Sequence, residues 1–100
     1  MAYHHLEESL TKGNLWFYIL AVLEEGEASP NSIKAAVTRR YGFSPATITF
    51  YSVLYRLRRE GLVRRSAETF RTDYVITERG SGELARARAL LERVRNGMGD

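Results

Sequence analysis

The sequence contains no cysteine and no glutamine, and its only lysines are Lys12 and Lys34. The lack of cysteine excludes disulfides, thiolate metal ligands and a cysteine nucleophile, and it fits a cytoplasmic protein. The longest apolar run, Leu15 to Leu23, is far shorter than the roughly 20 residues that a membrane-spanning helix needs. No basic segment precedes this run and no small-residue cleavage pattern follows it, so we expect no signal peptide.

Histidine is nearly as scarce, since the only two are His4 and His5. Adjacent side chains point in different directions on a helix or a strand, so this pair makes a poor metal site without a third ligand. Two neighbouring histidines support no Ser/His/Asp arrangement, and the chain has no glycine-rich phosphate loop. The carboxylates are scattered rather than paired for acid–base catalysis. We therefore expect no enzyme, no bound metal and no cofactor.

Arginine is abundant instead, and it is concentrated in the middle of the chain. The 100 residues fit one small domain, and a hydrophobic content of 44% is normal for a folded one. Residues 1–38 hold two Lys and five Glu, a net charge of −3, whereas residues 39–65 hold seven Arg and one Glu, a net charge of +6. Residues 66–100 are neutral, with six Arg against four Glu and two Asp. Such a basic block is expected where a protein contacts nucleic acid.

The first predicted helix is the apolar segment LWFYILAVLEEG, which follows Gly13 and Asn14 and ends at Gly26. It is apolar nearly all round, which predicts a place at the centre of the fold, where a second subunit can also cover it. Residues 1–10 before it are either a frayed tail or a short amphipathic lead-in.

A second helix is predicted from Ser29-Pro30, an N-cap residue followed by proline at the first helical position. It reads NSIKAAVTRRYG, turns Ile33 and Val37 inward and stops at Gly42. Ala36 and Tyr41 are further candidates for the same inward face.

A third helix is predicted from about Ala46 to Glu60, since Ser44-Pro45 repeats the start signal and Gly61 supplies the stop. The side chains expected to face inward are Phe50, Tyr51, Leu54 and Leu57. Two short helices joined by a tight turn that contains glycine make a helix-turn-helix.

The pattern then changes to that of a hairpin, with LVRR and YVIT as short strands and SAETFRTD between them. Residues 77–80, TERG, are expected to break the chain before a charged helix from about Ser81 to Asn96. The fold class is therefore mainly α with a small β-hairpin: a winged helix-turn-helix over residues 1–80, with an added C-terminal dimerisation helix and a short tail over residues 81–100. A narrow apolar stripe suited to a partner helix consists of Leu84, Ala87, Leu91 and Val94.

The chain resembles the PadR family of winged-helix transcriptional regulators over nearly its whole length. The resemblance rests on ILAVLEEGEASPNSIKAAV, TFYSVLYRLRREGLVRR and YVITERG. The residues that match the family's pattern are Tyr51, Leu54, Leu57, Gly61, Leu62, Tyr74, Thr77 and Gly80. The chain departs from that pattern at residues 29–31 and at Ile48 and Ser52, and its loop before the third helix is about one residue longer, which bears more on the DNA sequence and any effector than on the fold.

The resemblance implies a dimer, formed largely through the last helix with help from the first, that binds a two-fold, inverted-repeat operator in double-stranded DNA and usually represses. It also implies that some such dimers hold flat aromatic molecules in a space between subunits, which Trp16 could line. Packing in the core and at the dimer interface is the simpler account of Trp16, Phe17 and Tyr18. The interface residues we expect are Leu84, Ala87, Leu91, Val94 and Trp16.

The helical phase predicts a recognition face on the third helix. With Leu54 turned inward, Ser52, Arg56 and Arg59 fall on the opposite side, with Thr49 beside them. Small hydroxyls let a helix approach the major groove, and arginine forks to guanine or clamps phosphate. The wing would add a contact to the backbone or the minor groove. The candidate DNA-binding residues are Lys34, Arg39, Arg40, Ser44, Thr47, Thr49, Ser52, Arg56, Arg59, Arg65, Arg71 and Thr72.

A plainer account remains open for this face, since runs of arginine are also common on solvated surfaces. Lys34 and Arg71 fit an ordinary exposed side chain as well as a phosphate contact. The alternative function is a winged-helix protein-interaction module whose basic helix docks an acidic partner.

Overall fold

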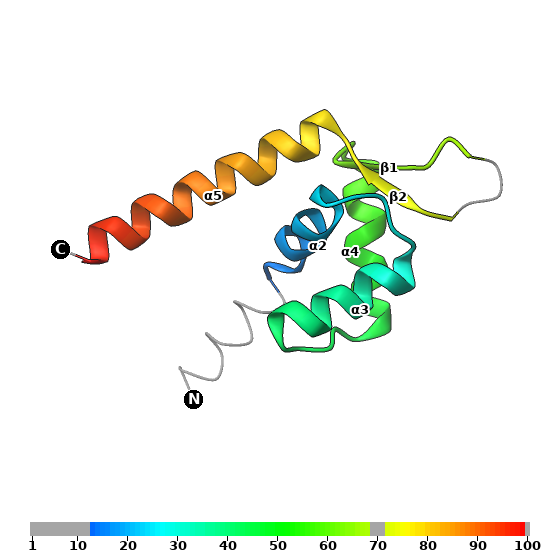
Figure 1. Cartoon of the computed structure of the whole chain (residues 1–100), viewed down its shortest axis with the longest axis horizontal. Helices are drawn as coiled ribbons and strands as arrows, with labels where there is room; N and C mark the ends of the chain where they lie inside the picture. Colours follow the sequence, from blue (N-terminus) through cyan, green and yellow to red (C-terminus); the bar gives the residue numbers. More distant parts are fainter. Residues whose placement is uncertain (1–12, 69–71, 100) are drawn as a thin grey trace.

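The computed structural model describes residues 13–68 and 72–99 of the chain. Three helices form a compact body, a two-stranded hairpin projects from one side of it, and a long last helix extends away on the other (Figure 1). The elements in chain order are α2 (Leu15–Glu24), α3 (Pro30–Tyr41), α4 (Thr47–Arg59), β1 (Val63–Arg65), β2 (Tyr74–Ile76) and α5 (Glu78–Gly99). The predicted order of helix, helix-turn-helix, hairpin and helix is confirmed.

Helix α2 lies at the centre, as its uniformly apolar sequence predicts. Ile19 and Leu20 are completely buried, and the core around them takes residues from every other helix and from the hairpin. Burying one such side chain stabilises a fold by about 1.5–3 kcal/mol. Three aromatic residues of α2, Trp16, Phe17 and Tyr18, remain only partly buried at its edge.

Helix α3 begins as predicted. The Ser29 hydroxyl accepts a hydrogen bond from the Ser32 backbone N–H, Pro30 occupies the first turn, and Gly42 ends the helix in the left-handed conformation with a φ of 75°. Ile33 and Val37 are fully buried. Tyr41 stays 37% exposed and stacks on the ring of Tyr18 at 4.2 Å.

Helix α4 begins at Thr47, within one residue of the predicted start at about Ala46, although Ser44 is not its N-cap. Its N-cap is Ala46, whose backbone is extended and whose side chain caps nothing. Proline disfavours helical geometry in the residue before it, so Ser44 stays outside the helix, and Pro45 is buried rather than helical. The C-terminal prediction is confirmed, because Gly61 follows the helix with a φ of 79°.

The hairpin is antiparallel and in the register Val63 to Ile76 and Arg65 to Tyr74. The loop before α3 joins it, since Ala28 and Tyr74 exchange two backbone hydrogen bonds of 3.2 and 2.8 Å. The loop before α3 therefore pairs with β2 on the edge that β1 leaves open.

Helix α5 begins at Glu78, three residues before the predicted start at Ser81, and so crosses the predicted boundary at residue 80. Thr77 explains the difference. Its hydroxyl donates to the Gly61 carbonyl at 2.6 Å and accepts from the Gly80 N–H at 3.0 Å, which caps the new helix and ties it to the end of α4. Residues 78–80 therefore begin the helix instead of breaking the chain.

The first turns of α5 pack against the body and its second half extends beyond it (Figure 1). Leu84 is completely buried in the core of its own chain, so its prediction as a dimer contact is wrong: it has no surface to offer. Ala87 is partly buried, whereas Leu91 and Val94 are 57% and 50% exposed. The predicted stripe is thus used within the chain at one end and left open at the other.

Candidate nucleic-acid interface

The outward face of α4 carries polar, basic and apolar side chains that line a shallow groove. This face carries Ser52, Arg56 and Arg59, as the helical phase predicts. All three are exposed, while Phe50, Leu54 and Leu57 fix the opposite side of the helix in the core. The helix therefore presents its arginines from a rigid support.

Tyr51 does not face the core as predicted. It is 45% exposed and lines the groove together with Ile48 and Tyr55, which are 85% and 64% exposed. The prediction failed because Phe50 takes the core position beside it, with the two rings packed edge to face at 5.4 Å. The spacing of residues 48, 51, 52 and 55 at steps of three and four was the signal that could have revealed this row.

Lys34 and Thr47, both candidates for DNA contact, bind each other. The Lys34 ammonium donates to the Thr47 hydroxyl at 2.7 Å, which joins the middle of α3 to the first turn of α4. Lysine has two further N–H donors, so this bond leaves it able to reach an anion as well. Lys34, Arg39 and Ser44 line a second shallow hollow beside this link.

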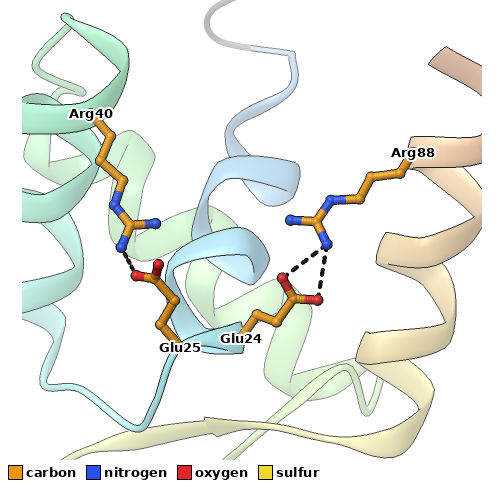
Figure 2. A network of polar contacts seen from close by, with 4 residues as sticks. All are labelled: Glu24, Glu25, Arg40 and Arg88. Atoms are coloured by element: carbon orange, nitrogen blue, oxygen red, sulfur yellow. Dashed lines mark hydrogen bonds and ion pairs between the residues drawn. The ribbon is translucent and has the colours of Figure 1, made fainter. Parts of the chain in front are cut away.

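Arg40 is directed elsewhere, and its assignment as a phosphate contact is not supported. Its guanidinium forms an ion pair with Glu25 at the C-terminal end of α2 (Figure 2). The side chain is only 32% exposed, so the arginine is used to join α2 and α3.

The wing is described only in part. Arg65 at the end of β1 and Thr72 are both exposed. Arg71 lies outside the described residues.

Among the basic residues of the α4 face, Arg56 has an acidic neighbour: its Nε lies 3.4 Å from Glu60 Oε1, with 69% and 47% of the two side chains exposed. An exposed pair of this kind is worth less than about 1 kcal/mol and leaves the arginine free to exchange its partner.

A second exposed apolar surface lies between the start of α2 and the middle of α5. A cavity of about 350 Å³ there is lined by Asn14, Trp16, Phe17, Tyr18, Ala87, Leu90 and Leu91. Within residues 13–68 and 72–97, the large hydrophobic side chains that are exposed fall on the α4 face and on the second half of α5, with Tyr41 as the exception.

The described part of the chain offers little else that could bind. No three of its His, Asp or Glu side chains gather where they could hold a metal ion. None of its helices is both long and apolar enough to cross a membrane. His4 and His5 fall outside the described residues.

The arrangement of helix-turn-helix, wing and exposed basic helix defines a winged-helix protein. No protein-family model matches the sequence, and no curated protein matches it either. Solved structures do. A PadR-like transcription factor from Bacteroides fragilis superposes with a TM-score of 0.78 at 20% identity, over 95% of this chain and 96% of that one.

Two further structures give the same result. A transcriptional regulator from Clostridium thermocellum superposes with a TM-score of 0.77 at 23% identity, over 91% of this chain and 92% of that one. A PadR-family transcriptional regulator from Eggerthella lenta superposes with a TM-score of 0.76 at 23% identity, over 99% of this chain and 94% of that one. The chain therefore has the winged-helix fold of PadR-family regulators, and the resemblance seen in the sequence is confirmed for the fold.

Proposed function

We propose that this protein is a homodimeric, sequence-specific DNA-binding regulator of transcription, and that it represses by occupying an inverted-repeat operator. The observation that carries the proposal is the outward face of α4, where Ser52, Arg56 and Arg59 stand exposed on a helix whose other side is locked in the core. In this class of fold, the second helix of the helix-turn-helix is the element that enters the major groove.

The +6 block of residues 39–65 supports the same function. Neutralising phosphates releases condensed counterions, so a basic face gives affinity for any duplex, while contacts to base edges select the sequence. In this proposal Arg39, Arg59 and Arg65 hold the backbone. Ser52 and Arg56 lie near the bases, and the wing touches the backbone or the minor groove.

Dimerisation is supported by the open half of α5. Leu90, Leu91 and Val94 are each at least half exposed, on a helix that extends away from its own body (Figure 1). Leucine and valine at helical spacing are unfavourable in water, and a second copy of the same helix would cover them. A two-fold dimer would then present two α4 helices to successive turns of DNA.

The cavity around Trp16 supports a small aromatic effector as an additional proposal. Its walls are mostly aromatic and aliphatic, and its volume of about 350 Å³ is within the usual range for ligand pockets. Because Trp16 is the only tryptophan, its fluorescence reports directly on this cavity. A panel of flat aromatic compounds should include one that quenches the fluorescence and releases DNA, and no quenching up to the solubility limit would contradict the effector.

One observation favours a second candidate function, a protein-interaction module. Ile48, Tyr51 and Tyr55 form an exposed row at the spacing by which a helix docks into an apolar groove. An acidic partner would then replace the duplex.

The experiment that separates the two is selection of bound duplexes from a random pool. Regulation predicts that the selected sequences are inverted repeats with one fixed spacing between half-sites, bound by two chains. A monomer that selects no sequence and shifts no duplex would contradict the proposed function and favour the interaction module.

A further inference from the structure

Ile48 is the most exposed large hydrophobic side chain in the described part of the molecule, at 85%. A single exposed apolar residue is common and needs no explanation. Ile48 is not isolated, because Tyr51 and Tyr55 follow it along the same groove of α4. It makes no contribution to the buried core, since Phe50, Leu54 and Leu57 fill that side of the helix. Its position is therefore free to serve contact with a partner.

The position of Ile48 within α4 is the second observation. It is the second residue of a helix that begins at Thr47, whereas Arg56 and Arg59 lie two to three turns further on. The N-terminal residues of a recognition helix reach the base edges. In the orientation of the proposed function, Ile48 would therefore meet bases, as Ser52 and Arg56 do, whereas Arg59 at the end of the helix would lie nearer the backbone.

The chemistry of the side chain then limits what it can recognise. Isoleucine has no hydrogen-bonding group, and its branched Cβ restricts it to few rotamers, so it presents a rigid apolar surface. The apolar group that the major groove displays is the 5-methyl of thymine. The hydroxyls of the neighbouring Thr47 and Thr49 can satisfy polar base edges on either side.

We propose that Ile48 is a specificity-determining residue that contacts the 5-methyl group of one thymine in each half-site. This inference rests on the proposed function and names a feature of its DNA site. The contact removes about one methyl group from water, which corresponds to roughly a fourfold preference for thymine over uracil at that position.

The test uses the full-length protein and the duplex obtained by selection. Each thymine of a half-site is replaced in turn by deoxyuridine, which pairs in the same way but lacks the methyl group. At one position, this replacement should weaken binding of the wild-type protein by roughly fourfold. Ile48→Ala should bind the thymine duplex about as weakly, and it should show no further loss when that thymine is replaced.

Ser52→Ala is the matched control, one turn along the same face, and it should keep the thymine–uracil difference. The fold of Ile48→Ala is secure, because an exposed isoleucine is exchanged for a better helix former. The inference would be overturned if no replacement of thymine by uracil changed the affinity, or if the selected half-sites contained no thymine. It would also be overturned if the Ile48→Ala protein still preferred thymine to uracil. Those outcomes leave the proposed function standing, whereas failure to bind any duplex would overturn both.

Discussion

One guanidinium nitrogen of Arg88, Nη1, lies 2.8 and 2.9 Å from the two carboxylate oxygens of Glu24 (Figure 2). Glu24 ends α2, and its neighbour Glu25 pairs with Arg40 of α3. Carboxylates at the C-terminal end of a helix are opposed by the helix dipole, and the two arginines offset that cost. The end of α2 thus connects the helix-turn-helix pair, α3 and α4, to the extended helix α5.

The first prediction concerns Arg88→Ala. Both side chains of its pair are almost half exposed, so removing the pair should lower the free energy of unfolding by less than about 1 kcal/mol. The larger expected effect is on geometry, because α5 would be held less firmly to α2. When duplexes with different half-site spacings compete for the protein, Arg88→Ala should accept a wider range of spacings than the wild-type protein does.

Arg86→Ala is the matched control for this change, since Arg86 pairs with Glu83 within α5 itself. It should leave the spacing preference unchanged. If Arg88→Ala and Arg86→Ala select the same single spacing as the wild type, the pair does not set the geometry of α5.

The second prediction contrasts two glycines in the first turns of α5. A Cβ on Gly80 would lie 2.1 Å from the Leu62 carbonyl oxygen, whereas a Cβ on Gly82 would meet nothing within 4 Å. Gly80→Ala should therefore destabilise the fold by about 3 kcal/mol or more, because the backbone must move. Gly82→Ala should stabilise it by about 0.5–1 kcal/mol through helix propensity.

Thermal unfolding followed by circular dichroism measures both glycine variants. For a domain of this size, the midpoint of Gly80→Ala should fall by roughly 12 °C or more, and that of Gly82→Ala should rise by a few degrees. Equal midpoints for the two variants would show that α5 does not approach Leu62 this closely.

The third prediction addresses the dimer. Leu91→Glu should place an unpaired charge in the proposed interface, which weakens association by about 3 kcal/mol or more, roughly a hundredfold. Ala89→Glu adds the same charge on the other side of α5 and should leave the dimer intact. Sedimentation equilibrium measures the mass directly, and a Leu91→Glu protein that remains as dimeric as Ala89→Glu would place the interface elsewhere.

The sequence predicted the fold well because its start and stop signals are local. Ser29, Gly42 and Gly61 act through their own backbone or through neighbours three residues away, which is why those helix ends were predictable. Thr77 acts differently. Its hydroxyl caps α5 locally by accepting from the Gly80 N–H, but it also donates to the Gly61 carbonyl, sixteen residues earlier, and an interaction over that separation leaves no periodic trace in the sequence.

The candidate site was predictable only in its helical phase. The opposition of Leu54 to Ser52, Arg56 and Arg59 follows from the period of the helix. The partners of Arg40 and Lys34 could not be predicted from that period, because Glu25 and Thr47 come from other elements. Leu84 shows the same limit: a stripe gives the face of a helix, but the position where the body ends decides which part of that face is covered.

The central claim is that the outward face of α4 binds DNA, and a salt titration of the Arg56→Ala, Arg59→Ala double variant tests it most directly. We expect weaker binding to the selected duplex, with the fold intact and the slope of log affinity against log salt reduced by about 0.9 for each phosphate that the protein no longer neutralises. The matched control is Arg93→Ala, Arg95→Ala in the second half of α5, which should retain the wild-type affinity and slope. A double variant of α4 with unchanged affinity and unchanged slope would contradict the account.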